Sequence, residues 1–247
     1  GKALMEQFCT EQGIPFQRCG KVIVATREEE RPVLHDILAR GQQNGVDCAL
    51  IDRARLQEIE PHTAGIEAIH VPESGIVDYK QVCERLAELL IAQGHKIITG
   101  AKVIAVREDN QQVTAATLNC SYNSDYLVNC AGLHSDRVTK MSGMSSPAQI
   151  IPFRGEYYEL KPEAEHLCRS LIYPVPDPKF PFLGVHFTLM ISGRVECGPN
   201  AVLAFAREGY YLTDFNSTDL WEILRYPGFR KLAAKYWRTG FGEMWRS

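Results

Sequence analysis

The chain has 247 residues, of which 45% are hydrophobic and 23% charged; this balance excludes a disordered chain and indicates a globular protein of one large or two smaller domains. The formal net charge of −3 gives little attraction to nucleic acid, so we expect a small-molecule partner and no nucleic acid. No run of about 18 apolar residues occurs, so the sequence predicts no transmembrane segment.

The cysteines and histidines give no sign of a metal site or a redox motif. No two cysteines form a CxxC pair, and no two histidines have metal-ligand spacing. Reduced thiols are therefore predicted, which favours a cytoplasmic location. The cysteines are Cys9, Cys19, Cys48, Cys83, Cys120, Cys130, Cys168 and Cys197.

The chain opens inside an amphipathic helix that ends at Gly13, and no methionine precedes it, so we expect a fragment of a longer protein. The next patterns predict, in order, a strand over 19–26, a helix over 28–45, a short helix over 51–61 capped by Asp52, and an edge strand over 65–72.

A well-marked helix is predicted over residues 77–94, with Asp78 as N-cap, Gln81 as its capping-box partner and Gly94 as stop. The segments that follow it predict strands within 95–109, 113–120 and 124–132, and a helix over 136–142.

Antiparallel strands are predicted from residue 150 onward, with a hairpin turn at 190–194 and helices near 217–225 and 228–238. A stiff, proline-rich loop spans 173–182. The fold class is therefore mixed, α/β in the first part and α+β in the second.

The stretch YLVNCAGLHSDRV, residues 126–138, predicts a buried strand, a small-residue turn at Ala131 and Gly132, and a helix N-terminus at Ser135. Such a turn leaves room and backbone N–H groups for a phosphate or a flat ring. A tight strand-to-helix connection without a ligand would have the same pattern. No GxGxxG motif occurs in the chain.

Eight segments carry a resemblance to a known family: CGKVIVAT, VPESGIVDY, GAKVIAV, LVNCAGLHSDRV, PFRGEYYEL, LIYPVPDPKFPFLGVHFT, GPNAVLAFAREGY and GFGEM. The chain resembles the L-2-hydroxyglutarate oxidase/dehydrogenase family, within the glycine oxidase and D-amino-acid oxidase superfamily of FAD-dependent oxidoreductases. The resemblance implies a two-domain fold. An incomplete Rossmann-like FAD domain would comprise residues 1–14 and 75–149, and a mainly antiparallel substrate domain residues 15–74 and 150–247.

The same resemblance implies FAD as cofactor. Val103 stands where the family holds the adenine end of FAD through main-chain atoms, and Ala131 and Gly132 stand where the chain passes the cofactor. The family's GxGxxG motif and its C-terminal flavin-contacting segment have no counterpart in these residues, which leaves open whether the chain alone binds FAD.

Arg154 and the tyrosines after it are candidate substrate residues. A dicarboxylate calls for planar, permanently charged donors, which arginine supplies in bidentate form. Tyr157 or Tyr158 would add a phenolic donor, and strand alternation lets only one of them share the surroundings of Arg154. The alternative is that Arg154 stacks on an aromatic ring or pairs with Glu156.

His186 is the candidate general base, because oxidation of a secondary alcohol requires removal of the hydroxyl proton and imidazole can accept it near neutral pH. The alternative is a histidine satisfied within the core. Asn200 lies at a predicted strand bend, where its amide would bind substrate or stabilise the turn.

The implied activity is oxidation of L-2-hydroxyglutarate to 2-oxoglutarate with hydride transfer to flavin, and oxygen or a membrane quinone would accept the electrons. A quinone acceptor would place the cytoplasmic protein peripherally at the inner membrane. Two alternatives stay open: a flavin amine oxidase acting on glycine, sarcosine or D-amino acids, and a non-catalytic fragment.

Overall fold

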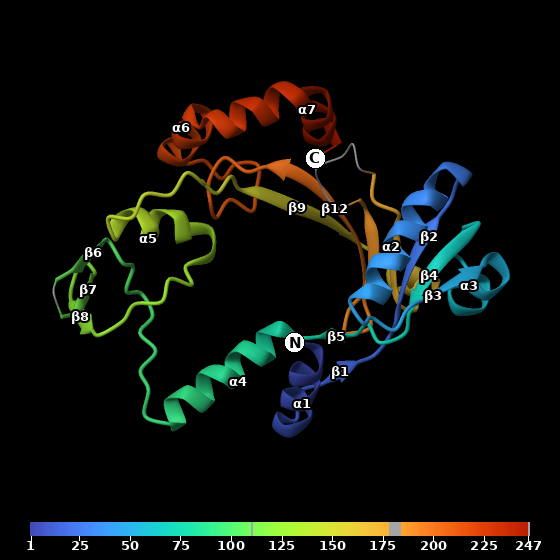
Figure 1. Ribbon diagram of the computed structural model, residues 1–247, viewed down its shortest axis with the longest axis horizontal. Helices are drawn as coiled ribbons and strands as arrows, with labels where there is room; N and C mark the ends of the chain where they lie inside the picture. The colour runs from blue at the N-terminus through green and yellow to red at the C-terminus, as the bar shows by residue number, and fades with distance from the viewer. Residues whose placement is uncertain (110, 178–183, 247) are drawn as a thin grey trace. The chain divides into compact units, whose positions relative to one another are not determined.

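The computed structural model describes residues 1–109, 111–177 and 184–246, and its helices and strands are shown in Figure 1. Two compact units are present, Gly1–His95 with Gly155–Asn200 and Lys96–Arg154 with Ala201–Ser247, here called unit 1 and unit 2. The division into a FAD domain and a substrate domain concerns ligand binding and stays a prediction. Part of the proline-rich loop, 178–182, lies outside the described residues.

A seven-stranded sheet has the strand order β3-β4-β2-β10-β11-β12-β9. Strands β2 and β10 are parallel, whereas β3–β4, β2–β4, β10–β11 and β11–β12 are antiparallel, which confirms the predicted mixed fold and the hairpin at 190–194. The strands are β2 Lys21–Ala25, β3 Ala49–Asp52, β4 Glu67–Val71, β9 Phe153–Glu159, β10 Leu171–Pro174, β11 His186–Leu189 and β12 Val195–Leu203.

The strand predicted over 65–72 is confirmed as β4, but its predicted position at the edge of the sheet is wrong. β4 lies between β3 and β2, and β3, which the sequence pattern did not indicate, lies beyond it. The alternating sequence of β4 does not mark an exposed face, because both faces of the strand are covered. Ile69 packs in a core with Leu34, and Ala68 packs in a second core with Leu56.

Two helices cover opposite faces of this part of the sheet. Helix α2, Arg31–Gln43, follows the 3-10 turn η1, Glu28–Glu30, and places Leu34 against Ala25. Helix α3, Arg53–Ile59, places Leu56 against Val22 and Val24. The Arg55 N–H donates to the Asp52 carboxylate at 2.8 Å, which confirms the predicted cap.

Helices α1, Lys2–Gln12, and α4, Tyr79–Ala92, share a third core that includes Cys9 and Val82, next to the short antiparallel pair β1, Phe16–Gln17, and β5, Ile76–Val77. Gly13 ends α1 with φ of 69°, a conformation that favours glycine. The Gln81 amide donates to the Asp78 carboxylate at 3.1 Å. Both helix predictions are confirmed.

Unit 2 contains a three-stranded antiparallel sheet, β6 Ala105–Glu108, β7 Val113–Ala116 and β8 Ser121–Ser124, followed by η2 Gly132–His134 and α5 Ser135–Met141. The prediction of a buried strand leading to Ala131 is wrong. Residues 126–130 form no strand, and Tyr126 and Val128 are 87% and 83% exposed. A strand requires a hydrogen-bonded neighbour, and none is present among the described residues.

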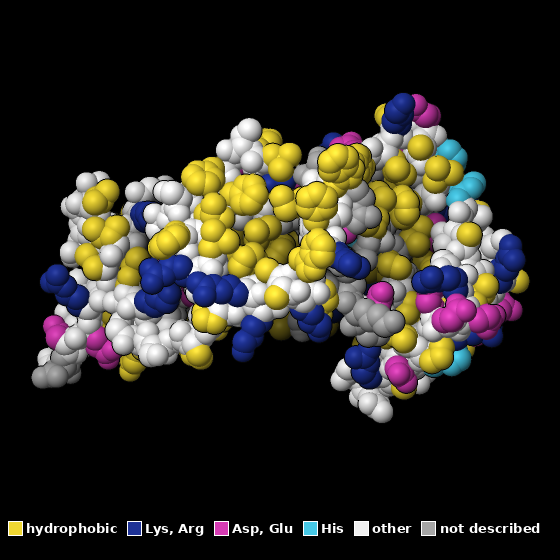
Figure 2. Space-filling view, turned by 90° about the horizontal axis from the view of Figure 1, so that it is seen from above, with side chains coloured by type: hydrophobic (Ala, Val, Ile, Leu, Met, Phe, Trp, Pro, Cys, Tyr) yellow, Lys and Arg dark blue, Asp and Glu magenta, His cyan; other side chains and the backbone are white. Residues whose placement is uncertain are grey.

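Helices α6, Ser217–Arg225, and α7, Pro227–Arg246, follow the last strand at the positions of the two predicted helices. Helix α7 is kinked at Tyr236, where φ is −118° and ψ is 19°, and extends beyond the predicted end at 238. The Asn216 side chain accepts the Asp219 N–H and caps α6. Exposed hydrophobic side chains, among them Trp221 and Trp237, share the outer surface of the two helices with basic side chains (Figure 2). Each helix therefore has one face in the unit and one at the surface.

Candidate active site

His186 begins β11 and is only 5% exposed. Its Nδ1 lies 3.1 Å from the Gly184 carbonyl oxygen. Because a carbonyl can only accept, Nδ1 carries the proton in this contact, and Nε2 of the neutral ring is left as a proton acceptor. The tautomer is therefore the one that a general base requires.

Two tyrosines contact the imidazole and form with it the His186 cluster, defined as Tyr157, Tyr173 and His186. The Tyr173 ring stacks on the imidazole at 4.2 Å between centroids, with 14° between the planes. The Tyr157 ring meets the imidazole edge to face at 6.4 Å and 80°. Three strands, β9, β10 and β11, thus hold one aromatic surface.

Both phenols of the cluster keep their protons. Burial raises the pKa of Tyr157, with a further rise from the charge of Glu196, and burial likewise raises the pKa of Tyr173. A protonated phenol can donate a hydrogen bond to an anion. Gly198 makes room for this arrangement, since a Cβ there would lie 2.7 Å from Cδ1 of Tyr157.

Sequence reasoning did not select Tyr173, which contacts the imidazole, or Lys21, which contacts Tyr173. The Lys21 Nζ lies 4.5 Å from the centroid of the Tyr173 ring. The sequence does show a lysine, Lys21, at the start of the apolar strand KVIVA. Its contact residue Tyr173 comes about 150 positions later in the chain, so the sequence pattern does not reveal the contact.

Asn200 and Arg154 have different surroundings. The Asn200 amide donates to the Glu156 carboxylate at 3.1 Å, so Glu156 orients it. Arg154 belongs to unit 2. It is only 7% exposed, so its guanidinium does not extend into water. Alternation along β9 directs Arg154 and Tyr157 to opposite faces. The substrate roles of Arg154 and Asn200 stay predictions.

The predicted cofactor residues lie in unit 2. Val103 precedes β6, and among the described residues its N–H and carbonyl have no backbone partner. The Ala131 N–H donates to Asn129, and Gly132 has φ of +52° with open space where a Cβ would stand. The main-chain groups of Val103 and the open turn at Gly132 fit a flat ring or a phosphate, whereas the Ala131 N–H is bonded to Asn129 and its carbonyl to the His134 N–H. The FAD roles of these three residues stay predictions.

A buried network of charges holds the turn at Ala131 to helix α6. Arg207 donates to both carboxylate oxygens of Asp136 and to the Leu133 carbonyl, and its own N–H donates to Asp219 at 2.8 Å. Arg137 bridges Asp219 and Glu222 at 2.5 and 2.7 Å. The sequence gave no local signal for this network.

The aspartates of this network remain ionised. Burial raises the pKa of Asp136, but hydrogen bonds from Arg207 outweigh burial and the pKa is lowered. Burial also raises the pKa of Asp219, but hydrogen bonds from the Arg207 N–H and from Arg137 outweigh burial, and the pKa is lowered. The turn that carries Ala131 and Gly132 is therefore fixed by charge as well as by packing.

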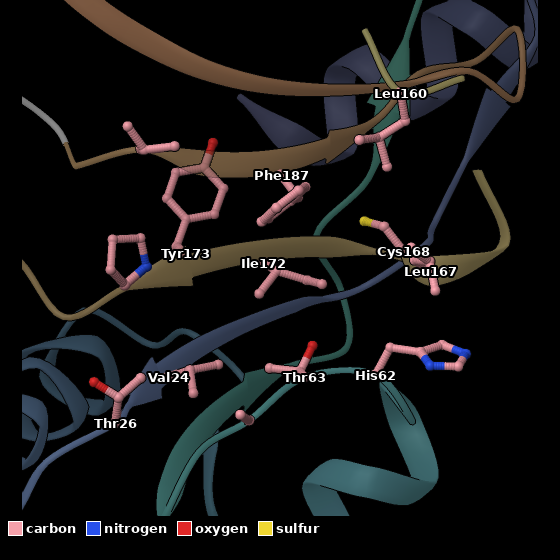
Figure 3. A pocket seen from close by; sticks show the side chains of 13 residues that line it. Val24, Thr26, His62, Thr63, Leu160, Leu167, Cys168, Ile172, Tyr173 and Phe187 are labelled. Carbon is pink, nitrogen blue, oxygen red and sulfur yellow. The ribbon is translucent and has the colours of Figure 1, made fainter. Parts of the chain in front are cut away.

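A separate, mostly apolar cavity of about 700 Å³ lies in unit 1. Val24, Ile172 and Phe187 line it from neighbouring strands, with His62 and Thr63 also on its wall (Figure 3). Tyr173 also lines the cavity, whereas His186, which alternates with Phe187 along β11, is not among its lining residues. The cavity has the size of a small-molecule site but offers no charged group.

Cys168 lines this cavity, and burial, with the nearby charge of Glu60, raises its pKa to about 12. We expect Cys168 to react with iodoacetamide at pH 8 at least about 100-fold more slowly than the exposed Cys83, because the thiolate is the nucleophile. A time course of peptide mass spectrometry measures both rates. Equal rates in the folded protein, with urea-unfolded protein as reference, would contradict the burial of this thiol.

The chain belongs to the family of FAD-dependent oxidoreductases, because the family model described as DAO, FAD dependent oxidoreductase, matches residues 1–243. It is 52% identical over 243 residues to an L-2-hydroxyglutarate dehydrogenase from Indibacter alkaliphilus, covering 98% of this chain and 61% of that protein. It is 43% identical over 269 residues to a mitochondrial L-2-hydroxyglutarate dehydrogenase from Nematostella vectensis, covering 100% of this chain and 57% of that protein.

A solved structure shares the fold. The L-alpha-glycerophosphate oxidase from Mycoplasma pneumoniae with FAD bound matches with a TM-score of 0.76 at 20% identity, covering 93% of this chain and 60% of that one. The chain spans about 60% of the length of the relatives it matches. In the described residues, no helix has the length and apolar character needed to cross a membrane.

Proposed function

We propose that the natural protein oxidises L-2-hydroxyglutarate to 2-oxoglutarate with FAD as hydride acceptor. In this proposal, residues 1–14 and 75–149 contribute to the FAD domain, and residues 15–74 and 150–247 to the substrate domain. The proposal is supported by the 52% identity to a protein of that name and by the site chemistry of His186.

The single observation that carries the chemistry is the hydrogen bond between His186 Nδ1 and the Gly184 carbonyl. It leaves Nε2 to accept the proton of the substrate hydroxyl while a hydride leaves the carbon that bears this hydroxyl. FAD supplies the two-electron acceptor when it is bound. The phenols of Tyr157 and Tyr173, protonated and adjacent, can donate to a carboxylate or to the developing carbonyl oxygen.

Steady-state assays of the natural protein test this proposal. We expect turnover with L-2-hydroxyglutarate to exceed turnover with glycine, sarcosine and D-alanine, with 2-oxoglutarate as the product. Activity on the amines alone would establish the amine oxidase alternative. A correctly folded protein with no flavin and no turnover would support the non-catalytic alternative.

Arg154 provides a second test, of charge recognition. If Arg154 binds the far carboxylate in place of a group on the His186 face, Arg154→Lys raises the KM for L-2-hydroxyglutarate by roughly tenfold, because lysine cannot reproduce a bidentate contact with carboxylate. The KM for the monocarboxylate L-2-hydroxybutyrate should change much less. Equal changes for both substrates, measured by initial rates, would remove Arg154 from the substrate site.

The electron acceptor and the location follow from the same proposal. Oxygen would suffice for a cytoplasmic oxidase, whereas a quinone acceptor would require peripheral association with the inner membrane. Rates of flavin reoxidation by oxygen and by a soluble quinone, compared after a single reduction, distinguish the two acceptors.

A further inference from the structure

Lys21 is a half-buried cation on the same face of the sheet as the His186 cluster. It lies in β2, Tyr173 lies in the adjacent β10, and His186 lies in the next strand, β11. The Tyr173 ring contacts both neighbours, with Nζ of Lys21 at 4.5 Å and the imidazole centroid at 4.2 Å. All three residues belong to unit 1.

No carboxylate balances this charge within the described part of the chain. Lys21 forms no ion pair or side-chain hydrogen bond there. Burial lowers the pKa of Lys21, and no neighbouring charge contributes to the shift. The contact with Tyr173 returns only about 0.5–1 kcal/mol, so a half-buried ammonium without an anion is an unusual feature that calls for a ligand.

The spacing between Lys21 and His186 suits a particular class of acid. Because 4.5 Å separates Nζ from the Tyr173 centroid and 4.2 Å separates that centroid from the imidazole centroid, Nζ lies within about 9 Å of the imidazole. An extended five-carbon hydroxy diacid places its hydroxyl roughly 5 Å from its far carboxylate. One hydrogen bond of about 2.8 Å at each end covers the remaining distance.

We propose that Lys21 binds the far carboxylate of the substrate while its hydroxyl lies at His186 Nε2, so that Lys21 selects dicarboxylic over monocarboxylic hydroxy acids. This inference rests on the proposed function and deepens it. Tyr173, between the two groups, sets their separation and offers its phenol to the bound acid. A three- or four-carbon monocarboxylate has no group that reaches Nζ.

Equilibrium binding of glutarate and of butyrate, measured by calorimetry on the natural protein, tests the proposal without turnover. We expect Lys21→Met to raise the Kd for glutarate by about 10- to 100-fold, the range for loss of a charge-assisted hydrogen bond. The Kd for butyrate should change by less than about twofold, within the variation of a surface substitution. Lys21→Arg, which keeps the charge, should recover part of the glutarate affinity.

Lys80→Met is the matched control, because it removes the same charge from the exposed surface of α4. It should leave both affinities unchanged. Lower thermal stability of Lys21→Met with unchanged glutarate affinity would show a purely structural contact with Tyr173 and overturn the proposal. Equal losses of glutarate and butyrate affinity in Lys21→Met would overturn the role of Lys21. The proposed function would still stand if the unmutated protein oxidises L-2-hydroxyglutarate. An unmutated protein with neither activity nor glutarate binding would overturn both.

Discussion

Arg207→Met is expected to lower the free energy of unfolding by about 3–5 kcal/mol, the usual cost of removing one partner from a buried ion pair. Arg207 is 4% exposed, and it neutralises Asp136, which is buried as well. Without the guanidinium, Asp136 keeps a buried charge and the Leu133 carbonyl loses a donor. Urea unfolding followed by circular dichroism measures the change.

Arg107→Met is the control for this experiment, because Arg107 is an exposed arginine of the same unit. Its effect should stay within about 0.5 kcal/mol. A similar small effect for Arg207→Met would contradict the structural importance of the network. Partial unfolding confined to the turn at Gly132 would still support it, and hydrogen exchange would detect that outcome.

The same network predicts a dependence of stability on pH. The folded-state pKa values of Asp136 and Asp219 are lowered, so the stability they contribute is present above the unfolded value near 3.9 and is lost as the pH falls through the lower folded values. In Arg207→Met the pKa of Asp136 loses its main cause of lowering, so protonation of Asp136 no longer costs folded-state stability. Acidification should therefore remove less stability from the variant, and the difference in the free energy of unfolding between the two proteins should shrink as the pH falls below about 3.9.

His186→Asn is expected to lower kcat for L-2-hydroxyglutarate by about 10²–10⁴-fold, the contribution of a positioned general base. Asparagine keeps an N–H donor for the Gly184 carbonyl but has no group that accepts a proton at neutral pH. The fold and the affinity for glutarate should therefore change little. Initial rates and calorimetry on the natural protein measure the two quantities.

The control is His95→Asn, at an exposed position after helix α4. It should leave kcat unchanged. A kcat for His186→Asn within about threefold of the unmutated protein, smaller than any general-base contribution, would show that His186 is a structural residue of β11.

Elements with local signals were predictable from the sequence. Helix α1 ends at Gly13, α4 begins at Asp78 and α6 begins after Asn216, and in each case the residue that caps or stops the helix lies next to it in the chain. The hairpin between β11 and β12 was predictable for the same reason, because its turn is a few residues long.

Features that depend on distant partners were not predictable. The segment 126–130 is apolar enough for a strand, but a strand requires a neighbour that sequence periodicity does not reveal. His186 could be selected by its chemistry alone. Lys21 and Tyr173 could not, because their proximity follows from the parallel pairing of β2 with β10. Arg207 and Asp136 are likewise brought together only by the fold.

The central claim is that the acid binds on the face of the sheet that carries His186. A crystal structure of the natural protein with 2-oxoglutarate tests it most directly. The account predicts the keto oxygen about 2.6–3.2 Å from Nε2 of His186, with the far carboxylate at Nζ of Lys21. A ligand bound in the apolar cavity lined by Val24 and Phe187, or anywhere remote from the imidazole, would contradict it.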